Sequence, residues 1–124
     1  TMIVFFGDHQ PNDVVAEPVL RLNGKSSRNL SAEDTKLRYQ VPYLIWANYE
    51  IDTKTKEDTS ANYLGMKVLE AAGITLPAYQ EFLKDFEKGY PILSAVRTEA
   101  ASSPEISKNE YQKLQYYELF DKGD

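Results

Sequence analysis

The sequence predicts a mixed α/β fold in which a few strands pack with about three helices. Two apolar runs rich in β-branched and aromatic residues, over residues 1–7 and 42–48, have the composition of strands. Three later segments combine helical spacing of apolar residues with clear start and stop signals. Both apolar runs fall far short of the roughly 20 residues that span a membrane, so we expect this chain not to be embedded in one.

The first strand is predicted over residues 1–7. Its continuous apolar character is typical of a strand buried on both faces in a parallel sheet. Because the first residues of a domain are usually exposed, a chain that opens within such a strand looks cut. We therefore expect a C-terminal piece of a larger catalytic domain.

Residues 8–40 are predicted to form a long polar loop region, because Pro, Asn, Gly and Ser recur there without a sustained period. Loops longer than roughly 12–15 residues are usually functional or disordered. The second half of this region is locally basic. Arg21, Lys25 and Arg28 are weak candidates for binding an anionic group, and an ordinary solvated loop is the alternative.

The second buried strand is predicted over residues 42–48. Pro42 cannot donate to a strand ladder, so the strand should begin at or just after it. Trp46 lies within this run, and we expect it in the core.

Residues 59–120 are predicted to be mainly helical. The first helix should follow a cap at one of residues 58–60 and end at Gly73, which supplies a left-handed stop. The second should start at Pro77 and end near Gly89. The third should start at the capping box of Ser107 and Glu110 and run to about residue 120. Residues 92–96 are a candidate short strand, and residues 97–104 a loop.

Composition narrows the chemistry. The chain has 14 Lys and Arg against 19 Asp and Glu, a net charge of −5 and no dense basic cluster, which argues against nucleic acid as a partner. It has no Cys and one His, which excludes disulfides, thiolate sites and His-rich metal sites. Any chemistry must use carboxylates, hydroxyls and His9.

Asp8 and His9 follow the first predicted strand, at the sheet edge where α/β proteins bind ligands. A carboxylate and a neutral imidazole together can bind one divalent ion, and they suit Zn²⁺ or Mn²⁺ better than Ca²⁺. Two ligands make only part of a site. Taken alone, the pair more often forms a polar turn after a strand.

Three stretches carry a resemblance to a known family. They are FFGDHQP over residues 5–11, VPYLIWANY over residues 41–49 and TSANYLG over residues 59–65. In this order they resemble the C-terminal third of the sulfatase-like phosphoglycerol transferases, the group of lipoteichoic acid synthase, within the alkaline phosphatase superfamily. The later helices also look like that branch. The Asp-His step is shared across the superfamily, whereas Gln10 after it is more specific, since ordinary sulfatases usually have glycine there.

The resemblance implies a bacterial membrane-anchored enzyme with an alkaline phosphatase-like, extracytoplasmic catalytic domain. Its threonine nucleophile attacks a phosphatidylglycerol-type lipid and passes phosphoglycerol to a glycan or polymer. By position, Asp8 and His9 correspond to two metal ligands, and the family's glutamate ligand and threonine nucleophile lie upstream of this sequence. The metal implied is Mn²⁺, with Mg²⁺, Zn²⁺ and Ca²⁺ as alternatives, and it activates the nucleophile and neutralises phosphoryl charge.

For the chain by itself we expect a soluble, inactive piece. Its expected partners are the rest of the catalytic domain and an anionic phospholipid, with self-association through an exposed strand edge. Four hydroxyls should not replace the nucleophile: Thr53 and Thr55, and Thr59 and Ser60, which helix capping explains.

Two alternatives stay open. The first is a sulfatase or phosphodiesterase-type hydrolase of the same superfamily, because the acceptor cannot be read from these residues. The second is a non-catalytic α/β binding module in which Asp8 and His9 form only a polar turn.

Overall fold

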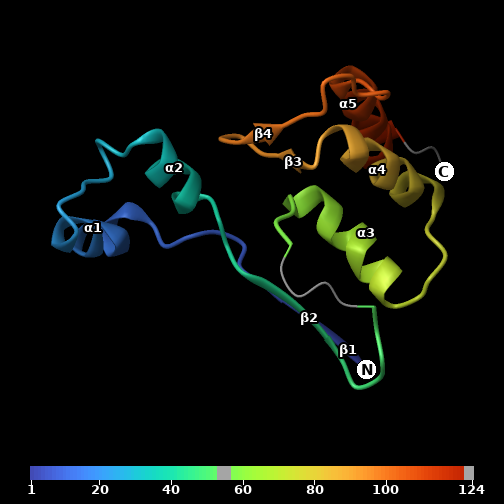
Figure 1. Cartoon of the computed structure of the whole chain (residues 1–124), viewed down its shortest axis with the longest axis horizontal. Helices are drawn as coiled ribbons and strands as arrows, with labels where there is room; N and C mark the ends of the chain where they lie inside the picture. Colours follow the sequence, from blue (N-terminus) through green and yellow to red (C-terminus); the bar gives the residue numbers. More distant parts are fainter. Residues whose placement is uncertain (53–56, 122–124) are drawn as a thin grey trace. The chain divides into compact units, whose positions relative to one another are not determined.

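A computed structural model describes residues 1–52 and 57–121, and the chain divides into two compact units, Thr1–Glu50 and Ile51–Asp124 (Figure 1). The described residues form five α-helices and two small antiparallel sheets. The prediction of a mixed α/β fold is therefore confirmed. No helix in these residues is long and apolar enough to cross a bilayer.

The first unit contains β1 (Met2–Phe6) and β2 (Tyr43–Ala47), close to where strands were predicted. The strands pair antiparallel, so the expectation of a parallel sheet is wrong. The reason is that the chain leaves β1 and enters β2 at the same end. There the Gly7 N–H donates to the Pro42 carbonyl at 3.1 Å, and the strands must run in opposite directions.

The strands are not buried as predicted. Ile3 lies opposite Trp46 and Phe5 opposite Leu44, and directly opposed side chains share one face of a sheet. All four are exposed, Phe5 by 65% and Trp46 by 48%, so the prediction of a core Trp46 is also wrong. An apolar strand is suited to burial, but burial also needs a second layer over the strand, which its own sequence does not provide.

The predicted loop over residues 8–40 is also wrong, because it contains α1 (Asp13–Leu22) and α2 (Ala32–Arg38). Asn12 and Ser31 cap these helices, and each side chain accepts a hydrogen bond from the N–H three residues later. In Figure 1, β1 and β2 lie side by side and both helices lie beyond one end of the pair.

A helical signal for α1 was present in the sequence. Val15, Val19 and Leu22 have the i, i+4, i+7 spacing of one helix face. Pro18 obscured it, because proline lacks an N–H and costs about 3 kcal/mol inside a helix. Gly24, read as a turn residue, has a φ of +68° and lies just after the end of α1.

The second unit contains the three helices predicted between residues 59 and 120. They are α3 (Ala61–Ala71), α4 (Ala78–Gly89) and α5 (Lys108–Tyr116), which continues as the π-helical turn η1 (Tyr117–Asp121). Gly73 follows α3 with a φ of +69°, and Ser107 and Glu110 form the predicted capping box of α5.

A short hairpin follows α4. It pairs β3 (Ile92–Leu93) with β4 (Thr98–Glu99). The candidate strand over residues 92–96 is thus two residues long, and β4 lies within residues that were predicted as a loop.

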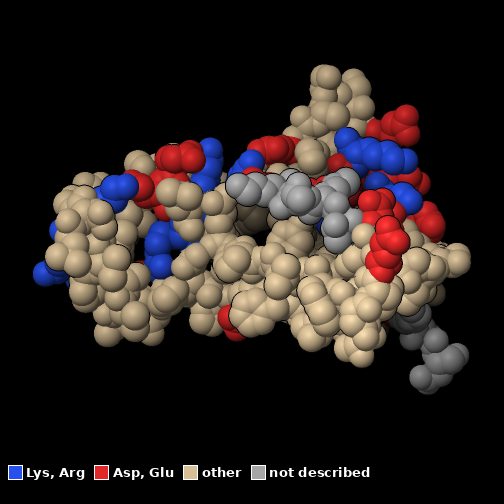
Figure 2. All heavy atoms as spheres, turned by 60° about the horizontal axis from the view of Figure 1, so that its bottom comes forward, with Lys and Arg blue, Asp and Glu red and all other residues tan. Residues whose placement is uncertain are grey.

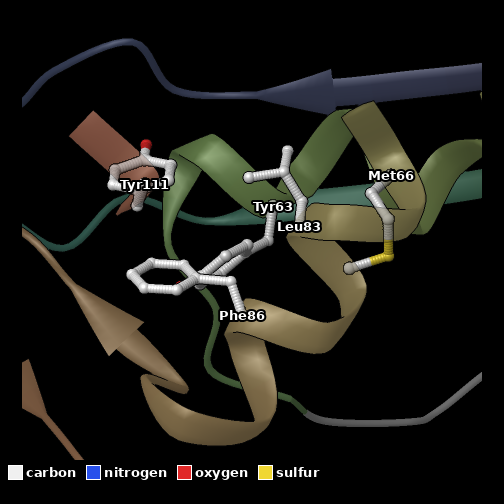
Figure 3. Packing of buried hydrophobic residues seen from close by; sticks show 5 residues of the cluster. All are labelled: Tyr63, Met66, Leu83, Phe86 and Tyr111. Atoms are coloured by element: carbon white, nitrogen blue, oxygen red, sulfur yellow. The ribbon is translucent and has the colours of Figure 1, made fainter. Parts of the chain in front are cut away.

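The core of this unit lies where the three helices meet (Figure 3). Its buried residues are Tyr63 and Met66 of α3, Leu83 and Phe86 of α4, and Tyr111 of α5. The rings of Phe86 and Tyr111 stack with centroids 4.6 Å apart, so Phe86 joins α4 to α5. The apolar spacing of each helix therefore serves one shared cluster.

Ser60 immediately precedes α3, but its side chain does not cap the helix. Its buried Oγ instead accepts a hydrogen bond from the Leu93 N–H of β3 at 2.7 Å. The capping explanation for Ser60 is therefore wrong, since a contact 33 residues away uses the hydroxyl. The neighbouring Thr59 Oγ1 is buried and has no hydrogen-bond partner among the described residues.

Phe86→Ala should lower the free energy of unfolding by about 3–5 kcal/mol, because it leaves a cavity at the centre of the cluster. Urea unfolding followed by circular dichroism measures this. Phe120→Ala, at a side chain that is 74% exposed, should change it by less than about 0.5 kcal/mol. Similar losses for both variants would contradict the central place of Phe86.

Ser60→Ala should cost about 1–3 kcal/mol, because the half-buried Leu93 N–H loses its acceptor. Thr59→Val is the matched control. It removes a buried hydroxyl that has no partner in the described structure, so it should be neutral or slightly stabilising. The same urea measurement compares them, and an equal loss in both variants would show that the Ser60 contact contributes nothing specific.

Candidate metal-binding segment after strand β1

Asp8 and His9 lie on the surface directly after β1, with side chains exposed by 82% and 77%. The Asp8 Oδ1 accepts a hydrogen bond from the His9 N–H at 2.9 Å, and the Asp8 Oδ2 lies 3.5 Å from His9 Nε2. On the other side of the ring, His9 Nδ1 lies 2.8 Å from the Gln10 carbonyl oxygen. The structure therefore brings the two predicted ligands together.

The contact with the Gln10 carbonyl favours one state of the imidazole. A carbonyl oxygen can only accept, so this hydrogen bond needs the proton on Nδ1. In the neutral ring, Nε2 then carries a lone pair, and it lies 3.5 Å from the Asp8 Oδ2. Two hydrogen-bond acceptors at this distance repel each other unless a proton or a cation lies between them and binds both.

The donor set fits a divalent cation. Two ligands that each lie about 2.1 Å from one tetrahedral ion are about 3.4 Å apart, close to the 3.5 Å between Nε2 and Oδ2. A carbonyl bound to the other ring nitrogen is the usual outer contact of a metal-binding histidine. In residues 1–52 and 57–121 no three acidic or His side chains form a metal-binding group, so this segment offers two ligands.

Hydrogen bonds hold this segment against the residues before β2. A Cβ on Gly7 would lie 3.0 Å from the Cβ of Val41, so the glycine permits the close approach. The Gln10 side-chain amide also donates to the Gln40 carbonyl. Gln10, which the resemblance singled out, thus has a structural contact of its own.

Arg38, in the last turn of α2, provides a further contact. Its guanidinium donates to the Pro11 carbonyl at 2.9 Å and to the Asp13 Oδ1 at 3.0 Å. Sequence reasoning missed Arg38, because its partners lie 25 and 27 residues away and no spacing rule joins them. The one sequence signal that could have pointed to Arg38 is the locally basic second half of residues 8–40.

The structure does not assign a shared role to the three basic candidates. Arg21 pairs with Glu17 at 3.1 Å and Lys25 with Asp34 at 2.5 Å, while Arg28 is exposed. Figure 2 shows basic and acidic side chains next to one another on the face that it draws. Two of the three charges are thus already balanced by carboxylates.

Glu17 joins α1 to the loop that follows it. Its carboxylate accepts hydrogen bonds from the Ser27 N–H at 2.8 Å, the Ser26 hydroxyl and Arg21. The Ser27 bonds foremost, and then Arg21, lower the pKa of Glu17 to about 2. Lys25 and Arg28 therefore lie in a loop that Glu17 orders, whereas Arg21 belongs to α1.

Other predicted positions contribute little to this site. Thr53 and Thr55 lie outside the described residues. A shallow apolar depression in the second unit contains none of the predicted site residues; it is lined by Phe82, Glu110, Lys113, Leu114 and Tyr117.

Comparison of the chain with protein-family models, curated proteins and solved structures found no match.

The lowered pKa of Glu17 predicts how this unit responds to acid. The stabilisation from its carboxylate is present above pH 4.5 and is lost as the pH falls toward about 2. Between about pH 5 and pH 2.5, the Tm of the wild-type chain should fall more steeply than that of Glu17→Gln.

Glu33→Gln is the control for this comparison, because it removes an exposed carboxylate that pairs with Lys36 at 3.4 Å. It should keep the wild-type dependence on pH. Thermal unfolding at a series of pH values measures all three proteins, and equal slopes for wild type and Glu17→Gln would exclude the role of Glu17.

Proposed function

We propose that this chain is the C-terminal part of the catalytic domain of a sulfatase-like phosphoglycerol transferase with an alkaline phosphatase-like fold. Asp8 and His9 would supply two ligands of its divalent metal, for which we propose Mn²⁺. One observation carries the proposal: His9 Nε2 and Asp8 Oδ2 lie 3.5 Å apart, while Nδ1 is bound to the Gln10 carbonyl. This arrangement supports chelation of one ion by adjacent residues.

The chain's residues would prepare this site rather than perform the reaction. When bound, the ion would polarise a phosphoryl oxygen and favour the deprotonated form of a hydroxyl nucleophile. Asp8 contributes a negative charge, and the Gln10 carbonyl keeps the proton on Nδ1 so that Nε2 stays available. The nucleophile and the other ligands belong to the rest of the domain, so this chain alone should turn over no substrate.

The proposed substrate is a phosphatidylglycerol-type lipid, whose phosphoglycerol group passes to a glycan or polymer. The parent enzyme would be membrane-anchored with its catalytic domain outside the cytoplasm. Support comes from Gln10 and Pro11 after the Asp-His step, as in that branch. Because Arg21 and Lys25 already have carboxylate partners, the exposed Arg28 is the best placed of the three to meet an anionic head group.

The exposed face of the β1 and β2 pair supports the proposal that the rest of the domain packs on it. Its four apolar side chains, Ile3, Phe5, Leu44 and Trp46, are about half exposed or more. Contiguous apolar patches on proteins often mark interaction sites. Without a partner, the isolated chain would self-associate through this face or through the open strand edges.

Titration with Mn²⁺ tests the proposal. In amide NMR spectra of the chain, the signals of residues 8–10 should broaden before all others. The midpoint should be no tighter than about millimolar, or roughly 4 kcal/mol, because only two ligands are present. Asp8→Asn and His9→Ala should abolish this selectivity, and Asp85→Asn, at an exposed carboxylate paired with Lys88, should preserve it.

Three results would count against the proposal. Broadening with no preference for residues 8–10 would favour the alternative of a plain polar turn in a binding module. A micromolar midpoint would mean that other ligands complete the site. In the complete enzyme, Asp8→Asn and His9→Ala should abolish transfer of phosphoglycerol from phosphatidylglycerol vesicles, and unchanged transfer would exclude these two residues as ligands.

A further inference from the structure

We propose that Arg38 is a positioning residue for His9: it holds the Pro11 carbonyl, and this fixes the Gln10 carbonyl that binds the imidazole. This inference rests on the proposed function, because the orientation of His9 Nε2 matters only if that atom binds a metal. The contacts behind it come from the chain's own residues.

The Arg38 guanidinium is well placed to act as a clamp. Its side chain is 20% exposed although it belongs to the surface helix α2. One terminal nitrogen donates both to the Pro11 carbonyl at 2.9 Å and to the Asp13 carboxylate at 3.0 Å. These partners lie on either side of Asn12, the cap of α1, so Arg38 fixes the path of the chain between His9 and that helix.

The path from Arg38 to His9 is short and stiff. The Gln10–Pro11 peptide is planar, and the proline ring fixes φ at residue 11. With the peptide planar and φ fixed, ψ of Pro11 is the one free torsion between the Gln10 carbonyl and the Pro11 carbonyl. Holding the first therefore restricts the second, which accepts the proton of His9 Nδ1 at 2.8 Å.

The consequence is chemical as well as geometric. The hydrogen bond made by one ring nitrogen decides which nitrogen carries the proton in a neutral imidazole. If the Gln10 carbonyl turns away, Nδ1–H loses its acceptor and the proton can move to Nε2, where it would hydrogen-bond the Asp8 carboxylate. A protonated Nε2 cannot bind a metal ion. Arg38 thus favours the tautomer that a metal site needs.

The single histidine makes this testable without a metal. In ¹⁵N-labelled protein, at a pH where the imidazole is neutral, the two ring nitrogen shifts report the tautomer directly. The wild-type chain should hold the proton on Nδ1, and Arg38→Ala should shift the population toward Nε2–H. Arg38→Lys keeps the charge but replaces the planar guanidinium by a more flexible ammonium group, so it should lie between the two.

Lys36→Ala is the matched control, because it removes the same charge from the same helix at a residue that pairs with Glu33. It should leave the tautomer unchanged. As a second measurement, the Mn²⁺ midpoint for broadening of residues 8–10 should rise about tenfold or more in Arg38→Ala, as is typical for loss of an outer contact. It should not rise in Lys36→Ala.

The outcomes separate the two proposals. A folded Arg38→Ala variant that keeps the proton on Nδ1 would overturn the role of Arg38, even if Mn²⁺ still binds at His9. Absence of selective Mn²⁺ broadening in the wild type would overturn the metal site, even if the tautomer depends on Arg38. If Arg38→Ala loses the β1 and β2 amide signals, Pro11→Ala decides instead. It releases φ at residue 11, and an unchanged tautomer would overturn the proposed path.

Discussion

The candidate site depends on how the chain closes one end of the β1 and β2 pair. There the Gly7 N–H reaches the Pro42 carbonyl at 3.1 Å, and glycine leaves room for Val41. Because of this approach, the residues after β1 run beside those before β2, and the bonds made by Gln10 and Arg38 can span the two segments. Asp8 and His9 are thus held from both sides of an exposed turn.

The helices of the second unit could be predicted because their signals act over a few residues. Gly73 ends one helix through its own φ, and the Ser107 and Glu110 capping box starts another through contacts three residues apart. The strands were found from composition, but their antiparallel pairing and their exposure were not. Pairing and burial depend on residues 37 to 45 positions away, which local patterns do not report.

For the candidate site, likewise, the residues could be predicted from short-range patterns but their contacts could not. The position of Asp8 and His9 after an apolar strand identified them as candidates. Their hydrogen-bond environment was not predictable, because Arg38 reaches Pro11 across 27 residues and belongs to α2, a seven-residue helix within the stretch that was predicted as a loop. Ser60 shows the same limit: its place before a helix indicated a cap, while its actual partner is Leu93. Patterns over a few residues can identify candidate residues. The contacts that decide what those residues do come from distant parts of the sequence.

A polar turn and a metal ligand are compatible uses of the Asp8 carboxylate, because they use different oxygens. Oδ1 accepts the His9 N–H at 2.9 Å and fixes the turn, while Oδ2 faces His9 Nε2. The turn therefore orders the second oxygen before an ion binds, and part of the ordering cost is removed from the binding step. Two exposed ligands still leave most of the ion's coordination open. Such a site gains useful affinity when other residues complete it, which is the condition that the proposed parent domain would meet.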